Sequence, residues 1–420
     1  MEKCLICGLE INKIPLFKLL FNKTMFVAYI LILAGFFGIY EVIGERYFSV
    51  VANAHASGID PTNPALIEAM KNAVFGHVGE VTREVPWTLF IVNYMYMIYT
   101  GSGIIFLVAL AELLNIKVIA KTAAAFMTLG LAFVFAGLFT IATDLNILNM
   151  LWMFKDPNFG AGMWLMLPLY SIYIPFVLFE IYLLITNKKE LVKKVSFAIL
   201  VLSIVVDIVE FYIQAKLFSM NTSRHLWTEF PILTLYFIIS AFVASLGVMG
   251  IFSALIYRNL PNYHELIEVI RKALLFFISV LALYEIIAYL YVDKEWAFLM
   301  LFGPFKYAFF GGYILLTMTI PFLLIFKESK NTLTIIASVC VAIGAYVGRY
   351  LFVYGGNANP MTNRFGVGFE KYDIYDISNS YNYVAPHMGE ILIVIGSFGI
   401  MIFIYKFLDE VFDVSKVREH

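Results

Sequence analysis

Residues 143–174 read TDLNILNMLWMFKDPNFGAGMWLMLPLYSIYI. An apolar segment ends at Asp144, a short piece containing a tryptophan follows, and a second apolar segment begins near Gly160. The Asp-Pro-Asn at 156–158 interrupts any helix, because proline lacks an N–H donor and disfavours helical backbone at the residue before it. Tryptophan and phenylalanine suit the membrane interface, where amphipathic rings lie at headgroup level. The stretch therefore predicts two membrane helices joined by a loop, which is either an ordinary interfacial connection or a functional one.

Composition extends this reading to the whole chain. The 420 residues are 61% hydrophobic and 14% charged, and the mean hydropathy is +0.85. Soluble domains lie near ~45–50% apolar and ~25% charged residues. The formal net charge of −1 gives no reason to expect a nucleic-acid partner. The chain is therefore predicted to be an all-α integral membrane protein surrounded by lipid.

Segments that cross a bilayer as helices contain about 20 apolar residues. Ten are predicted, at residues 24–46, 85–113, 118–143, 161–186, 195–217, 230–256, 272–292, 296–326, 332–354 and 386–408. Alternate connections hold 18 of the 29 lysines and arginines, and the other connections hold 9. The positive-inside rule then predicts a multi-pass protein of the cell membrane with cytoplasmic termini, residues 1–23 and 409–420. The first segment lacks a small-residue cleavage site, so we interpret it as a retained helix.

A faint internal repeat relates two parts of the membrane domain, residues 24–408. Ile174-Pro175-Phe176 recurs as Ile320-Pro321-Phe322, prolines 86 and 231 open helices, and Asp144 and Asp293 end apolar segments. The offsets of 145, 146 and 149 residues correspond to four helices, which preserves orientation. We therefore predict two four-helix bundles in a parallel repeat, residues 84–218 and 230–354, with one flanking helix at each end.

Three connections on the predicted outer face are long, at residues 47–84, 144–160 and 355–385. Connections of such length are usually functional or bind partners. The first is expected to carry an amphipathic helix over Pro64–Val74.

The cysteines limit the metal chemistry of the chain. Cys4 and Cys7 form a CxxC without a second pair, so these thiolates alone cannot complete a zinc site. The pair is either free and reduced on the cytoplasmic side or half of a site that a partner completes. Cys340 lies in an apolar segment and is expected to pack there.

Ionisable side chains within the predicted helices are candidates for function, because a charge inside a bilayer is costly. The set contains five carboxylates and two basic residues, which are either steps of a proton pathway or groups that satisfy one another. Its members are Glu112 and Glu180 near cytoplasmic helix ends, Asp207 and Glu210 one turn apart, Glu285 near mid-membrane, and the basic residues Lys306 and Arg349.

Polar and aromatic residues gather in the predicted outer half of the helices. A quinone headgroup needs hydrogen-bond partners for two carbonyl oxygens, aromatic walls and a route for protons. The candidate quinone-binding residues are Trp87, Asn93, Tyr94, Asp144, Trp164, Tyr170, Tyr173, His387 and Glu390.

Histidines are scarce. Of the 6 in the chain, only His387 lies even at the edge of a predicted helix, whereas a membrane b-type haem needs two facing histidines within the helices. We predict no haem, no iron–sulfur cluster and no metal in this chain. Electrons must then arrive from another subunit, and the chain has no redox centre of its own.

The order Asp144-Leu145, Trp152, Pro157-Asn158, Met163-Trp164 and Tyr170 resembles the NrfD/PsrC family of quinone-reactive membrane subunits of respiratory oxidoreductases. Asn146 and Ile147 replace the family's Gly-Arg. Pro86-Trp87 resembles the family's Pro-Trp-Gly, with Thr88 in place of the glycine. Arg349-Tyr350, Gly355-Gly356, Tyr383 to Pro386 and Glu390 are similar to the ten-helix branch that includes hydrogenase-2-type (HybB-like) subunits. The resemblance covers roughly residues 85–408.

This resemblance implies a quinone, for example menaquinone, as the bound substrate in anaerobic respiration. It also implies a ferredoxin-like iron–sulfur subunit on the outer face, with a catalytic subunit beyond it: a molybdopterin reductase, a nickel–iron hydrogenase or a multihaem cytochrome. Two alternatives stay open. A secondary transporter is disfavoured by the parallel repeat and by polar residues near one surface. A structural anchor would keep the partners without quinone.

Overall fold

The computed structural model describes residues 3–6, 9–12, 15–56, 58, 60, 63–68, 87–144, 155, 162–186, 189–220, 227, 232–291, 300–327, 330–358 and 385–417. Within these residues ten helical spans are long and apolar enough to cross a membrane. They are α2 (Lys23–Ala56), α4 (Leu89–Leu113), α6 (Ala123–Asp144), α8 (Gly162–Ile185), α9 (Lys189–Ser219), α11 (Leu233–Ile256), α12 (Tyr263–Tyr291), η1 (Ala308–Thr319) continued by α14 (Ile320–Phe326), α15 (Asn331–Ala358) and α17 (Met388–Phe412).

The predicted all-α membrane fold with ten spans is therefore confirmed. The starts of the seventh and eighth spans differ most from the predicted starts. The helix α12 begins at Tyr263 rather than at residue 272, and the eighth span begins at Ala308 rather than at residue 296. The second difference has a local cause, because Gly303-Pro304 interrupts the helical backbone just before this span. The span then begins as a π-helix, a form that is rare and concentrated at functional sites.

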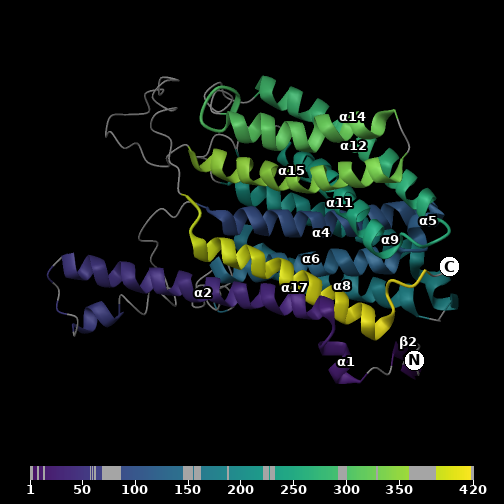
Figure 1. Cartoon of the computed structure of the whole chain (residues 1–420), viewed down its shortest axis with the longest axis horizontal. Helices are drawn as coiled ribbons and strands as arrows, with labels where there is room; N and C mark the ends of the chain where they lie inside the picture. The colour runs from purple at the N-terminus through teal and green to yellow at the C-terminus, as the bar shows by residue number, and fades with distance from the viewer. Residues whose placement is uncertain are drawn as a thin grey trace.

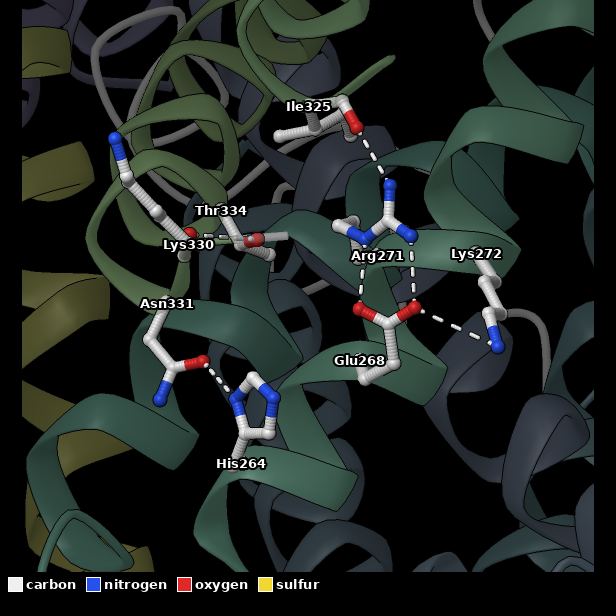
Figure 2. A network of polar contacts seen from close by, with 8 residues as sticks. All are labelled: His264, Glu268, Arg271, Lys272, Ile325, Lys330, Asn331 and Thr334. Carbon is white, nitrogen blue, oxygen red and sulfur yellow. Dashed lines mark hydrogen bonds and ion pairs between the residues drawn. The ribbon is translucent and has the colours of Figure 1, made fainter. Parts of the chain in front are cut away.

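The early start of α12 is explained by a polar network at one end of the bundle (Figure 2). Arg271 forms a two-pronged contact with Glu268, at 2.8 Å from Nε to Oε2 and 2.7 Å from Nη2 to Oε1. Its Nη1 also donates to the carbonyl oxygen of Ile325 at 2.6 Å, near the end of α14. His264 Nδ1 lies 2.7 Å from Asn331 Oδ1, at the first residue of α15. The sequence alone places these charged residues in a loop. In the structure they belong to α12 and join it to α14 and α15.

Helix packing gathers the spans into sets (Figure 1). In one set α4 packs on α6 and α9, and α8 packs on α9 and α6. In the other set α15 packs on α11, η1 and α14, and α12 packs on α11. The two sets meet where α4 contacts α11 and α15, and α2 and α17 pack on each other, with α17 lying against α6. The predicted parallel repeat of residues 84–218 and 230–354 stays a prediction.

The helix α4 is the centre of the fold. In the most apolar stretch of α4, 94% of the residues are buried. Its sequence is apolar on all sides, as expected of a helix surrounded by others. Close approach to α6 depends on glycine. A Cβ on Gly101 would lie 2.6 Å from the carbonyl oxygen of Gly130, and a Cβ on Gly130 would lie 2.7 Å from that of Gly101. Larger residues at either position would separate these two helices.

A small hairpin, which the sequence did not predict, precedes the membrane helices. Strands β1 (Lys3–Ile6) and β2 (Leu9–Asn12) pair antiparallel, with Cys4 opposite Ile11, and the short helix α1 (Leu16–Leu20) follows. The side chain of Asn12 donates to the carbonyl oxygen of Glu410 and to Asp413 Oδ1, both at 2.9 Å. The hairpin is therefore fixed to the end of α17, and the first and last parts of the described chain lie at the same end of the bundle.

Several sequence predictions fall on other parts of the chain. Of the expected helix over Pro64–Val74, residues 64–68 are helical and the rest lies outside the described residues. Most of the three long connections also lies outside them, as do Cys7, Pro86, Pro231 and Asp293.

Candidate functional site

A file of polar side chains runs along the interface of α4, α8 and α9. Ser203, Asp207, Glu210 and Gln214 of α9 are spaced by four, three and four residues, which places them on one face of the helix. The facing residues are Tyr170, Tyr173 and Glu180 of α8 and Tyr94 of α4. We call these eight residues the polar ladder. Each of them is at most 7% exposed.

One end of the ladder is a cluster of two tyrosines, an amide and a carboxyl group. The Tyr170 hydroxyl donates to Glu210 Oε1 at 3.0 Å and accepts from Gln214 Nε2 at 2.7 Å. Gln214 Nε2 also donates to the Tyr94 hydroxyl at 2.8 Å, while the two hydroxyl oxygens are 3.4 Å apart. Because Tyr170 donates to Glu210, the Tyr94 hydroxyl can donate either to the Tyr170 oxygen or to a ligand.

The middle and the far end of the ladder repeat this pairing of hydroxyl and carboxyl groups. The Tyr173 hydroxyl donates to Asp207 Oδ1 at 3.0 Å, and the Ser203 hydroxyl donates to Glu180 Oε2 at 3.2 Å. Glu112, one residue before the end of α4, lies close enough to Glu180 to interact with it electrostatically. Four predicted members of the proton pathway, namely Glu112, Glu180, Asp207 and Glu210, are thus placed in one file.

Several hydrogen-bond acceptors along the ladder lack a partner among the described residues. Glu112 Oε1, Asp207 Oδ2, Glu210 Oε2 and Gln214 Oε1 are buried without a hydrogen-bond partner in the described part of the chain. Buried polar atoms in proteins are nearly always paired, so unpaired ones call for a proton, a water molecule or a ligand. The ladder therefore has the chemical capacity to hold and pass protons.

The length of the polar ladder can be compared with the thickness of the membrane. Tyr94 and Glu112 stand 18 positions apart on α4. At ~1.5 Å per residue this corresponds to about 27 Å, against about 30 Å for the hydrocarbon core. The ladder together with Glu112 therefore extends across most of the membrane.

The predicted quinone residues divide among three places. Tyr94, Tyr170 and Tyr173 belong to the ladder. Asn93, their neighbour in sequence, faces α6 and α17 instead, where its Nδ2 donates to Thr140 Oγ1 at 2.8 Å and to Ser397 Oγ at 2.9 Å. Adjacent residues on a helix point about 100° apart, which explains the separation.

A second group lies at the ends of α2, α6 and α17. Glu390 is 6% exposed, and its carboxyl group interacts electrostatically with Asp144 and His387. His387 Nδ1 also lies 3.5 Å from Glu45 Oε1 of α2, with both side chains about half exposed. Trp164 is half-buried at the start of α8. Asp144, Trp164, His387 and Glu390 thus lie at helix ends and form the rim of that end of the bundle.

Trp87 occupies a third place, between the two sets of helices. Its ring stacks on Trp227 at 4.8 Å and meets Phe218 edge-on at 4.9 Å between centroids. Trp227 Nε1 donates to the carbonyl oxygen of Phe352 at 3.0 Å, and Asn357 donates to the carbonyl oxygen of Trp87. Trp87 therefore packs α4 against α9 and α15 rather than joining the tyrosines.

The remaining predicted pathway residues lie away from the ladder. Glu285 and Arg349 belong to a separate polar cluster among α11, α12, η1 and α15, which is described below. Lys306 stands before the eighth span and lies over the ring of Tyr307 at 5.1 Å. It does not pair with any buried carboxylate in the described residues. Of the two basic residues predicted to lie deep in the membrane, only Arg349 is therefore near a buried carboxylate.

Sequence reasoning missed Gln214 and Ser203, which complete the ladder. The signal was present, because positions 203, 207, 210 and 214 share one helix face, but only the charged members were singled out. No group of three or more histidine, cysteine, aspartate or glutamate residues in the described part of the chain is arranged to hold a metal ion.

Residues 77–360 match the family described as polysulphide reductase, NrfD, which is more than half of the chain and includes the whole ladder. No curated protein sequence matches the chain significantly. The chain therefore belongs to the NrfD polysulphide reductase family, whose members are membrane subunits of quinone-linked oxidoreductase complexes.

Proposed function

We propose that this subunit exchanges electrons and protons with a quinone held at the Tyr94 end of the polar ladder. The observation that carries the proposal is the contact of Gln214 Nε2 with the hydroxyl oxygens of both Tyr94 and Tyr170, which holds the two hydroxyl groups together at one end of the ladder. Tyr94 is the proposed hydrogen-bond donor for a quinone carbonyl oxygen. Tyr170 then links that position to Glu210, the nearest group able to supply a proton.

Proton transfer to the quinone follows from the same arrangement. A quinone that accepts two electrons also takes up two protons to become a quinol. Tyr94 and the Tyr170–Glu210 pair are the nearest donors, and Asp207 stands one turn behind Glu210 on α9. Protons that leave these groups are replaced along the ladder through Tyr173, Ser203 and Glu180 towards Glu112. A positioned acid or base typically contributes about 10²–10⁴-fold to a rate.

The electrons must come from a partner, because haem, iron–sulfur and metal ligands are not predicted in this chain. We propose a ferredoxin-like iron–sulfur subunit at the rim formed by Asp144, His387 and Glu390, with a catalytic subunit beyond it. The outer location of this rim, the cytoplasmic termini and the hydrogenase-2-type branch stay predictions. Menaquinone is the proposed substrate among quinones.

The test uses the complex purified with the subunits that accompany it and reconstituted in sealed liposomes with a menaquinone analogue. Glu210→Gln keeps the shape of the side chain but cannot carry a transferable proton, so quinone-dependent turnover should fall about 10²-fold. Glu41→Gln is the matched control, since Glu41 also lies in a spanning helix but is exposed on α2. Unchanged turnover in Glu210→Gln would refute the proposal. Accompanying subunits without any extractable quinone or quinone-dependent turnover would instead indicate a structural anchor.

A further inference from the structure

A second polar cluster lies among α11, α12, η1 and α15, away from the ladder. The Tyr313 hydroxyl donates to Glu285 Oε1 at 2.5 Å. Arg349 Nη2 donates to the Ser240 hydroxyl at 2.9 Å. Glu285 is 5% exposed and Arg349 is 3% exposed, so both charged groups are withdrawn from lipid and from bulk water.

The guanidinium group of Arg349 is incompletely satisfied. It has five N–H donors. Its hydrogen bond to Ser240 is the one it makes with the described residues, and Nη1 is buried without a partner there. Rings of Tyr99, Tyr236 and Phe237 lie 4.7, 5.8 and 5.7 Å from the guanidinium carbon. A desolvated cation–π contact contributes about 2 kcal/mol, well below the cost of burying an uncompensated cation. A counter-ion and further acceptors are therefore required.

Two adjoining cavities lie between Arg349 and Glu285. One, of about 20 Å³, is bordered by Glu285, Tyr289 and Met300, among others. The other, of about 10 Å³, is bordered by Arg349, Ser240 and Thr317, among others. Both are lined by Tyr236, Tyr313 and Gly348, so they share a wall. A water molecule needs ~10–15 Å³ and two to four polar partners. The second cavity offers such partners, because the Thr317 hydroxyl and Arg349 Nη1 are buried and have no hydrogen-bond partner in the part of the chain that the structure describes.

We propose that water in these two cavities joins Glu285 to Arg349 as a hydrated ion pair, in which Glu285 is the fixed counter-ion of the guanidinium and carries no proton during turnover. Two observations support this assignment. The two cavities share Tyr236, Tyr313 and Gly348 in their lining, so water in them can bridge the two charged groups. Tyr313 donates to Glu285 Oε1, and a hydrogen bond donated to a carboxylate favours its ionised form.

Arg349 also gives the pair a connection to the ladder. Tyr99 of α4 lies against the guanidinium on one side and packs on Phe211 at 5.6 Å between centroids on the other. Phe211 follows Glu210 directly on α9. Arg349 is thus a positioning residue for Tyr99, where the two sets of helices meet. Only this last step rests on the proposed function, because the ion pair exists whether or not the ladder conducts protons.

The test is a double-mutant cycle in the purified complex, with Glu285→Gln, Arg349→Gln and both together. Removing one partner of a buried ion pair leaves the other uncompensated, so each single variant should lower the thermal midpoint by several degrees. The double variant should recover most of that loss. Charge movement per turnover in sealed liposomes should stay at the wild-type value in Glu285→Gln. The infrared absorption of the wild-type complex minus that of Glu285→Gln should contain an ionised-carboxylate band.

If the variants of Glu285 and Arg349 fail to assemble, a pair of variants that keeps both charged groups provides the test. Thr317→Val preserves shape but removes a buried hydroxyl that has no partner among the described residues, on a side chain that lines the second cavity. If water is bound there, the thermal midpoint should fall. The control is Thr128→Val, because the Thr128 hydroxyl is buried and already donates to the carbonyl oxygen of Ala124 at 2.7 Å.

Three results would overturn the proposal. They are a midpoint that stays the same or rises in Thr317→Val, a double variant no more stable than the weaker single one, and loss of charge movement in Glu285→Gln while turnover persists. The last would make Glu285 a proton carrier. Failure of the proposed function would instead appear as normal turnover in Glu210→Gln, which leaves this pair untouched.

Discussion

The substitution Tyr170→Phe removes one oxygen atom from the centre of the ladder and leaves the ring in place. That oxygen donates to Glu210, accepts from Gln214 and lies 3.4 Å from the Tyr94 hydroxyl. The ring itself meets Tyr173 edge-on, with centroids 6.4 Å apart, and keeps this contact in the variant. The change therefore isolates the role of the hydroxyl group.

The expected cost can be worked out from these partners. Gln214 keeps its hydrogen bond to Tyr94, so the loss of its bond to Tyr170 costs about 1 kcal/mol. The cost at Glu210 is larger. Its Oε2 already lacks a partner among the described residues, and its Oε1 would lose the hydrogen bond from Tyr170. An unsatisfied buried acceptor costs about 1–3 kcal/mol. Stability should therefore fall by about 2–4 kcal/mol in total, which a large membrane complex should tolerate.

Turnover should suffer independently of stability. If Tyr170 transmits protons from Glu210 to the quinone, its loss should slow quinone-dependent turnover about 10²-fold, or about 2.7 kcal/mol in the barrier. The assay measures turnover and the thermal midpoint on the same purified complex. Tyr212→Phe is the matched control, because Tyr212 lies on α9 with 57% of its surface exposed. Wild-type turnover in Tyr170→Phe, with the midpoint lowered, would show that the cluster is structural and that quinone reacts elsewhere.

Three further predictions follow from particular contacts. Gly35→Ala should lower the thermal midpoint, because its Cβ would lie 2.9 Å from the Gly396 Cα. Gly44→Ala on the same helix, where a Cβ would have no atom within 4 Å, should be neutral or stabilising by about 0.5–1 kcal/mol. Equal effects of the two substitutions would contradict the packing of α2 on α17. Arg271→Lys should lose about 1–2 kcal/mol of stability with its contacts to Glu268 and Ile325, whereas Lys272→Met should change little, since that side chain is 70% exposed and lies 3.5 Å from Glu268. The separated subunit should show no haem bands in reduced-minus-oxidised spectra, and a b-type spectrum from this chain would refute the prediction.

Much of the fold could be predicted from sequence because the membrane imposes it. Apolar length alone located all ten spans, since a helix is the form in which a single segment satisfies its own backbone in lipid. The errors arose where charge and apolarity compete. The predicted start of α12 is too late, because the sequence places Arg271 in a connection, whereas Glu268 of α12 neutralises it and the carbonyl oxygen of Ile325 in α14 accepts a hydrogen bond from it. The paired strands β1 and β2 are too short to give an alternating pattern that stands out.

The candidate site could be predicted in part. Asp207 and Glu210 were placed on one face by their spacing, but their partners depend on how α8 is rotated against α9, which no local pattern states. Asn93 illustrates the limit, because depth in the membrane grouped it with Tyr94 while helix rotation sends it to Thr140 and Ser397. Arg349 was expected to satisfy a carboxylate directly. Its nearest charged groups are instead reached across aromatic rings and cavities, a geometry set by tertiary packing.

The two polar clusters differ in a way that bears on how this subunit handles charge. A carboxylate that serves only structure is expected to have both oxygens occupied, since an unpaired buried acceptor destabilises the fold. In the ladder and at its far end, Glu112, Asp207 and Glu210 each leave one oxygen without a partner among the described residues, and the file contains no basic residue. The other cluster holds a permanent cation and a short contact to its carboxylate. A group that must release its proton benefits from lacking a fixed counter-ion, and a group that must keep its charge benefits from having one. The two proposals together place mobile charge beside α9 and fixed charge beside α15, with Tyr99 in contact with both Arg349 and Phe211.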